Sequence, residues 1–208
     1  LSNGTLVLNG GTLTVNENSN ITSDITHIDD SIINVNSGKT LSYTGSAPEI
    51  GALTLTMSGG GTFDNTNDFT LNDPVSVLAL NGIAVSRVSV TAELTTGKLG
   101  VNNDSIVKTF SHPASSRLNI SAGVRLTVED SFEIPENTSL NLVGAGNGFL
   151  ALSDTLTLSG KIKFDCLKVV CVSFFSVTKS MLQFVDQMSS LPGNLKFLHL
   201  KFLALRKS

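Results

Sequence analysis

The stretch VRLTVEDSFEIPENTSLNLVGAGNGFLALSDTLTLSGKIKF, residues 124–164, decides the fold, because it consists of short apolar alternations separated by polar turns. In a β-strand, alternate side chains lie on the same face of the sheet. The regularly spaced apolar residues of this stretch all have even numbers: Val124, Leu126, Val128, Phe132, Ile134, Leu140, Leu142, Leu150, Leu152, Leu156, Leu158, Ile162 and Phe164. Each turn therefore returns the chain to the same face, as a coil around one apolar core requires. The stretch predicts a parallel β-helix.

The N-terminal part of the chain repeats this pattern. A nine-residue template, apolar-x-x-Gly/Asn-x-x-Leu-x-apolar, fits four segments: VLNGGTLTV (7–15), VNSGKTLSY (35–43), ISAGVRLTV (120–128) and IPENTSLNL (134–142). The Gly or Asn of the template stands where the turn requires a positive φ, which these residues adopt at least cost. Residues 1–164 are therefore expected to form about six to eight coils of ~20–25 residues, stacked roughly 4.8 Å apart.

The spacing is less regular between Phe69 and Phe110, where a longer apolar run is interrupted by Asn81 and Gly82. An Asn-Gly pair between two apolar runs is a typical signal of a tight antiparallel hairpin. A parallel coil does not normally contain such a hairpin. We therefore expect an irregular turn of the coil, or an excursion from it, in this segment.

The composition changes abruptly after Phe164. Residues 1–161 carry 7 Lys and Arg against 15 Asp and Glu, a net charge of −8, whereas residues 162–208 carry 7 against 2, a net charge of +5. Apolar residues at helical spacing in 178–188 and 195–205 predict one or two short helices. We therefore expect a β-helix domain over residues 1–164. Residues 165–208 are expected to be a short tail, either a helical cap on the open end of the coil or a non-native, disordered extension.

Two N-terminal segments, GGTLTV (10–15) and ITSDITHIDDSIINVNSGKTLSYTG (21–45), resemble the repeats of bacterial surface and secreted β-helix proteins. The resemblance is to autotransporter passenger domains and haemagglutinin-like exoproteins, and it covers residues 1–164. It implies a right-handed, single-stranded parallel β-helix, in a segment of a larger exoprotein. It also implies an extracellular or outer cell-surface location and a role in adhesion, aggregation or toxin display.

The residues leave two classes of function open. Short polar Thr, Ser and Asn at the outward positions favour a non-enzymatic adhesin or structural stalk. Its expected partners are host-surface or matrix glycans or proteins, or a second copy of the solenoid. The alternative is a carbohydrate-active β-helix enzyme, similar to a polysaccharide lyase or glycoside hydrolase, which needs carboxylates and basic residues on one lateral face. Glu129, Asp130 and Glu133 cluster in the sequence, but we assign no catalytic residue and no cofactor.

Asp64 and Asp68, with Thr66 between them, are weak candidates for calcium ligands, because they offer oxygen atoms at alternate positions. Calcium prefers six to eight such oxygens. Asp29 and Asp30 supply two further carboxylates in another turn. The glycine run 59–61 does not complete the Gly-Gly-x-Gly-x-Asp repeat of calcium-binding β-rolls. A solvated acidic turn is the favoured interpretation.

Several other motifs predict no site. The tetrapeptide SGKT (37–40) has Ile33 where a phosphate-binding loop requires its first glycine. His27, His112 and His199 lack partners at metal-ligand spacing, and we expect surface or turn positions for them. The acidic composition argues against a nucleic-acid groove. The apolar run 166–177 is too short to be a transmembrane segment.

Overall fold

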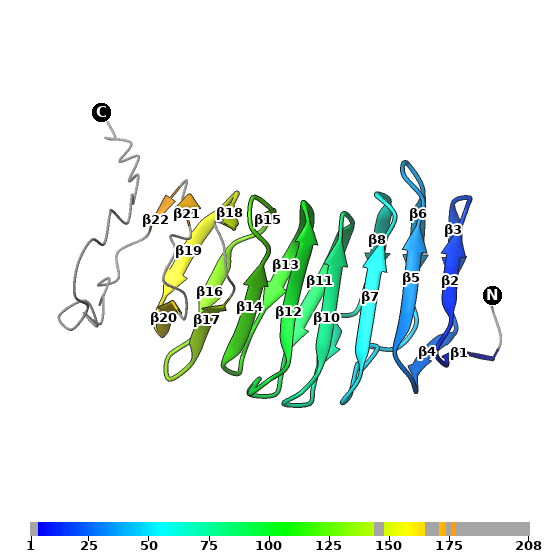
Figure 1. Cartoon of the computed structure of the whole chain (residues 1–208), viewed down its shortest axis with the longest axis horizontal. Coiled ribbons are helices and arrows are strands. Elements are labelled where there is room, and N and C mark those ends of the chain that lie inside the picture. The colour runs from blue at the N-terminus through cyan, green and yellow to red at the C-terminus, as the bar shows by residue number, and fades with distance from the viewer. Residues whose placement is uncertain (1–3, 144–147, 165–170, 174–175, 178–208) are drawn as a thin grey trace.

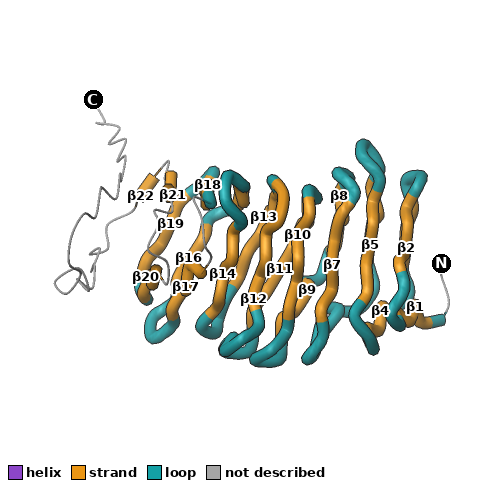
Figure 2. The backbone as a smooth tube through the Cα atoms, viewed as in Figure 1, coloured by secondary structure: helices purple, strands orange, loops and turns teal. Residues whose placement is uncertain are grey.

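The computed structural model describes residues 4–143, 148–164, 171–173 and 176–177 (Figure 1). The regular elements of these residues are strands, and no helix occurs among them. The strands follow the three faces of a coil of about seven turns, which confirms the predicted parallel β-helix. Figure 2 shows the turns stacked side by side along the long axis of the molecule.

The first face is an eight-stranded sheet to which successive turns contribute one strand each. In spatial order it contains β2 (Thr12–Val15), β5 (Ser31–Val35), β7 (Thr54–Ser58), β10 (Val77–Asn81), β12 (Lys98–Asn103), β14 (Ser116–Ile120), β17 (Ser139–Val143) and β20 (Lys161–Phe164).

The second face is a nine-stranded sheet. It contains β3 (Ser19–Ile21), β6 (Thr40–Tyr43), β8 (Thr62–Asn65), β11 (Ala84–Val90), β13 (Ser105–Ser111), β15 (Arg125–Val128), β18 (Phe149–Leu152) and β21 (Cys171–Ser173), with β9 (Phe69–Leu71) also pairing with β11. The third face is shorter, with β1 (Thr5–Leu8) and β4 (Asp24–His27) at one end and β16 (Phe132–Ile134), β19 (Thr155–Leu158) and β22 (Ser176–Val177) at the other. Each of these pairings is parallel.

The register of the eight-stranded sheet gives the length of each turn. One inward column pairs Leu13, Ile33, Met57, Leu80, Val101 and Ile120 in succession. Consecutive members of this column are 20, 24, 23, 21 and 19 residues apart in the sequence. The length of a turn therefore varies around the expected value, and the register shifts between Leu80 and Asn81 where β10 pairs with β12.

The apolar core occupies the interior of the coil, as the even spacing predicted. Leu126, Phe132, Leu140, Leu150 and Leu156 are all at most 3% exposed, whereas Val124 and Ile162 are partly buried against the core. The side chains of Leu158 and Phe164 lie outside the described set. Burial of one such side chain contributes roughly 1.5–3 kcal/mol. A column of them therefore accounts for most of the stabilisation that stacking provides.

The four segments that fit the nine-residue template form the same kind of turn. Their Gly or Asn residues have positive φ values, namely 70° at Gly10, 71° at Gly38, 75° at Gly123 and 63° at Asn137. In three of these turns the amide after the left-handed residue donates to the carbonyl three residues earlier, at 2.9–3.2 Å. This confirms the prediction that the template marks corners where the backbone turns through a left-handed residue.

The Asn81–Gly82 pair does not close a hairpin, and the expected irregular turn is confirmed, because the register between β10 and β12 shifts between Leu80 and Asn81. β10 ends at Asn81 and pairs with β7 and β12, while β11 begins at Ala84 and pairs with β8 and β13. Gly82, with a φ of 73°, therefore turns a corner from the first sheet to the second instead of closing a hairpin. The hairpin signal fails because both flanking strands find partners in the neighbouring turns of the coil.

Beyond Phe164, β21 pairs with β18 and β22 pairs with β19, so two short strands continue the second and third faces. The helices predicted in 178–188 and 195–205 lie outside the described residues. In the part of the chain that the structure describes, no helix has the length and apolar character needed to cross a membrane.

Candidate functional site

A polar corner of the solenoid lies where β11 and β13 run from the second face onto the third without interruption. On one side of this pair the chain breaks between β8 and β9, and on the other side it breaks between β15 and β16. Phe63 pairs with Val85 and Phe69 pairs with Val88. Between these two pairs the preceding turn advances by six residues, whereas β11 advances by three. The additional residues form a loop, 66–68, that projects from the face.

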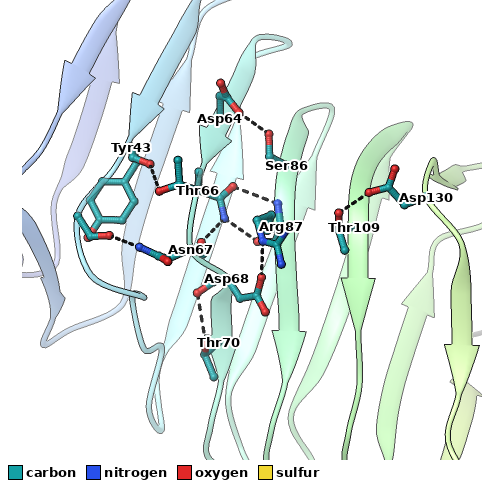
Figure 3. Close-up of polar contacts among 12 residues, drawn as sticks. Tyr43, Asp64, Thr66, Asn67, Asp68, Thr70, Ser86, Arg87, Thr109 and Asp130 are labelled. Atoms are coloured by element: carbon teal, nitrogen blue, oxygen red, sulfur yellow. Dashed lines mark hydrogen bonds and ion pairs between the residues drawn. The ribbon is translucent and has the colours of Figure 1, made fainter.

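Hydrogen bonds to the preceding turn hold this loop in place (Figure 3). The amide of Thr66 donates to the carbonyl of Tyr43 at 3.0 Å. The side-chain amide of Asn67 donates to the carbonyl of Gly45 at 2.7 Å. The Tyr43 hydroxyl is itself bonded, accepting from the amide of Ile25 and donating to a nearby carbonyl. The loop is therefore tied to its neighbouring turn through both backbone and side chains.

Asn65 is an inward-facing polar residue at the base of the loop, and it is only 2% exposed. Its Nδ2 donates to the carbonyls of Asn67 and Arg87, both at 2.7 Å. Its Oδ1 accepts from the amide of Arg87 at 3.2 Å. Because a buried polar group is costly unless it is paired, these three bonds account for the asparagine at an otherwise apolar position. They also fix the backbone from which Arg87 extends outward.

The two calcium candidates lie on this corner and already have partners. The Ser86 hydroxyl donates to Asp64 Oδ1 at 2.7 Å, and Arg87 Nε lies 2.8 Å from Asp68 Oδ1. Both partners of the ion pair are partly exposed, so it contributes at most about 1 kcal/mol. Among the described residues, no group of three or more His, Cys, Asp or Glu could hold a metal ion. The structure places Asp64 in β8 and Asp68 in the loop that follows it, but does not test the calcium prediction.

On the other side of β11 and β13, the turn after β15 carries Glu129 and Asp130. Their amides donate to the carbonyls of Val107 and Lys108, at 3.2 and 2.9 Å. The Asp130 carboxylate accepts a hydrogen bond from the Thr109 hydroxyl. Lys108, whose side chain is exposed, lies next to Thr109 in β13. The structure therefore brings one basic residue, Lys108, next to Glu129 and Asp130 through the backbone pairing, whereas Arg87 is engaged with Asp68.

At each of two further corners, a serine side chain joins adjacent turns. The hydroxyl of Ser31 donates to the carbonyl two residues earlier at 2.7 Å and accepts from the amide of Gly10 at 3.2 Å. The hydroxyl of Ser105 makes the same pair of bonds, at 2.8 Å and, from the amide of Gly82, at 3.1 Å. Both serines are less than 5% exposed. Each serine accepts a hydrogen bond from the amide of a left-handed glycine on the preceding turn, a role that we did not predict.

The aspartate before each of these serines extends the link in the other direction. Asp30 Oδ1 accepts from the amide of Thr54 at 2.7 Å. Asp104 Oδ1 accepts from the amide of Arg125 at 2.8 Å. Each Asp-Ser pair therefore bonds to the turn before it and to the turn after it. These carboxylates act as structural acceptors for backbone amides.

The SGKT tetrapeptide forms the corner between β5 and β6. Lys39 Nζ forms an ion pair with Glu17 Oε2 at 2.8 Å, and the amide of Thr40 donates to Asn18 Oδ1 at 3.0 Å. Gly38 is the left-handed residue of the turn. The lysine and the threonine amide are thus engaged with the preceding turn of the coil.

The histidines occupy different environments. Nδ1 of the half-buried His27 lies 3.3 Å from the carbonyl of Ile50. The expectation of a surface or turn position is wrong for His112, which is 1% exposed, with its ring centroid 5.7 Å from that of Phe110 and 5.1 Å from that of Phe132. Neither ring nitrogen of His112 has a hydrogen-bond partner among the described residues. Burial lowers the pKa of His112 to about 4, and the backbone of Ala114 only partly opposes the shift. His199 lies outside the described residues.

No protein-family model matches the sequence, and no curated protein or solved structure is significantly similar to it. The functional argument therefore depends on the fold and on the chemistry of its surfaces.

Proposed function

We propose that the solenoid is a non-enzymatic segment of a cell-surface or secreted protein, an adhesin or a structural stalk of a larger exoprotein of bacterial type. The observation that carries the proposal is the use of the acidic side chains. Carboxylates on several turns accept hydrogen bonds or an ion pair from an adjacent turn: Asp30, Asp64, Asp68, Asp104 and Asp130. Groups engaged in this way hold the shape of a long lateral surface.

The outward positions supply a broad contact surface. One outward column of the nine-stranded sheet pairs Thr40, Thr62, Ala84, Ile106 and Thr127 in succession. These side chains are small or β-branched, and the three threonines add hydroxyls to the column. A surface of this kind favours many weak contacts along its length, whose combined strength exceeds that of any one of them.

The adhesin role is tested with beads that carry the purified chain, applied under flow to wells coated with epithelial-cell matrix. Leu140→Asp, which places a charge in the apolar core, is the unfolded control. We expect several-fold greater retention of the wild-type beads. Equal retention of both proteins would reject the adhesin role and leave the stalk.

A carbohydrate-active enzyme is the second candidate, and one observation favours it. Arg87 and Lys108 lie on the same uninterrupted strand pair that Asp68 and Asp130 flank. Carboxylates and basic groups on one lateral face are what polysaccharide cleavage requires. The test is release of reducing ends from polygalacturonate by the purified chain. If the purified chain releases reducing ends and Asp68→Asn abolishes this release, the enzyme becomes the favoured candidate.

A further inference from the structure

The described strands of one face of this acidic solenoid carry basic residues and no acidic ones. The eight described strands of the eight-stranded sheet contain no Asp or Glu. They contain four basic residues, which we call the basic row: Lys98, Arg117, Lys161 and Lys163. Residues 1–161 nevertheless carry a net charge of −8. The acidic residues therefore lie mostly in the turns. The strands of the nine-stranded sheet carry Arg87, Lys108 and Arg125 against one acidic residue, Asp64, so the eight-stranded sheet differs in having no acidic residue on its described strands.

The register aligns three members of the basic row. Lys98 and Arg117 directly precede Leu99 and Leu118, which pair with each other, so the two basic residues are neighbours on consecutive turns. Arg117 pairs with Asn141, which pairs in turn with Lys163. Leu99 and Leu118 are buried, so the residues before them lie on the outer face. At roughly 4.8 Å per turn, the row extends for about 14 Å along the solenoid.

Lys161 widens the row at its C-terminal end. It pairs with Ser139, two residues before Asn141, so it lies one outward position along the strand from the aligned residues. Both Lys161 and Lys163 are exposed. The described ion pairs, Lys39 with Glu17 and Arg87 with Asp68, involve none of the basic row. The row therefore presents its charge to solvent without acidic partners on its own sheet.

Hydrogen bonding is incomplete at the centre of the row. Arg117 Nε is a buried donor and Asn141 Oδ1 is a buried acceptor, and neither has a partner among the described residues. The two residues are direct neighbours in the register. A buried donor or acceptor is costly when it is left unpaired.

We propose that the basic row binds a linear acidic polysaccharide, with Arg117 holding a carboxylate or sulfate and the lysines holding neighbouring anionic groups. This inference rests on the proposed function and names the partner class of the surface segment. Guanidinium groups recognise such anions through paired hydrogen bonds. The outward neighbours Asn119 and Asn141 can bond to sugar hydroxyls. Single-stranded nucleic acid fits less well, because the outward positions of β12, β14, β17 and β20 offer no aromatic ring for base stacking.

The proposal is tested with the full chain and three immobilised polymers, polygalacturonate, dextran sulfate and neutral dextran. The test variant is Arg117→Gln/Lys163→Gln. The matched control is Lys39→Gln/Arg125→Gln, which removes the same charge away from the eight-stranded sheet. We expect the wild type to bind at least one acidic polymer and not dextran. The test variant should lose about tenfold in affinity, as expected for two partly exposed charge contacts, while the control should change by less than about twofold.

Each other outcome overturns the inference. Equal losses in the two double variants would show that net charge alone governs binding. Equal binding to dextran, or tighter binding to a single-stranded DNA oligomer with the same sensitivity to Arg117, would reject an acidic polysaccharide as the partner. Circular dichroism of both variants excludes unfolding as the cause. Release of reducing ends during the assay would reject the non-enzymatic function separately, because it is measured independently of affinity.

Discussion

Acidification is expected to destabilise the solenoid through His112, and replacing this residue by Phe should remove that effect. The His112 ring is 1% exposed and lies beside the rings of Phe110 and Phe132, which stack on each other at 5.4 Å. Neither of its nitrogens has a partner among the described residues. Glu93 and Glu133, on the neighbouring turns, are exposed. A proton on the buried ring would therefore be poorly compensated.

The sign of the effect follows from the two pKa values of His112. The pKa is 6.5 in the unfolded chain and about 4 in the folded chain. Above pH 6.5 the ring is neutral in both states and has no effect on the pH dependence of stability. As the pH falls from 6.5 towards 4, the unfolded chain gains the proton and the folded chain does not. The free energy of unfolding should then fall by about 2 kcal/mol at pH 5 and about 3 kcal/mol at pH 4, relative to pH 8.

The assay is urea unfolding followed by circular dichroism at pH 8, 6, 5 and 4. The wild type also loses stability through its carboxylates at low pH, so the difference between wild type and His112→Phe isolates the histidine. This difference should grow by about 2 kcal/mol between pH 8 and pH 5. His112→Leu serves as a second variant if Phe is too large, and His27→Gln is the control. Parallel pH profiles for the wild type and both His112 variants would refute the reasoning.

Three further substitutions test the packing and the links between turns by urea unfolding. Leu140→Asp places an unpaired charge at a position that is 0% exposed and should lower the free energy of unfolding by at least about 4 kcal/mol or prevent folding. Its control, Asn119→Asp on the outer face, should lower it by less than about 1 kcal/mol. Similar losses for the two variants would contradict the inward assignment of Leu140. Ser105→Ala leaves the Gly82 amide unpaired and should cost about 1–3 kcal/mol; no loss would remove the proposed link. Gly59 has a φ of 108°, and a Cβ added there would lie 2.2 Å from the carbonyl oxygen of Val35. Gly59→Ala should therefore lower the free energy of unfolding by about 2 kcal/mol or more. No change in stability would contradict the close approach of the turns.

The sequence predicts the inward residues and the corners well, because both depend on local chemistry. Leu140 is inward because side chains alternate along a strand and the turns preserve the alternation. Asn137 adopts a φ of 63° because the corner needs a left-handed residue and asparagine adopts that conformation at low cost. Neither property depends on which turn of the coil lies next to it.

Properties that depend on neighbouring turns could not be predicted in this way. The turns differ in length by up to five residues, from 19 to 24, so the alignment of Lys98 with Arg117 does not follow from the spacing. The burial of His112 depends on Phe132, which belongs to the following turn. The Asn81–Gly82 corner carries a strong local hairpin signal that parallel pairing with other turns overrides.

One structural feature did leave a signal in the sequence. Asp-Ser-Ile occurs at 30–32 and again at 104–106, and Leu-Asn-Gly occurs about one turn earlier in both cases, at 8–10 and 80–82. These are the segments in which Ser31 and Ser105 bond to left-handed glycines. A search for tripeptides that occur twice in the sequence would have identified both links.

The stacking register underlies the fold, the polar corners and the basic row, and one distance tests it most directly. Thr12 and Asn119 belong to one outward column of the eight-stranded sheet and are separated by five turn-to-turn steps. At roughly 4.8 Å per step, their backbones should be about 24 Å apart. Spin labels on Thr12→Cys and Asn119→Cys, in a background of Cys166→Ser and Cys171→Ser, report this distance by pulsed electron paramagnetic resonance. A single narrow distribution near 24 Å, allowing several Å for the labels, is the expected result, whereas a broad distribution or a distance below about 15 Å would contradict the register.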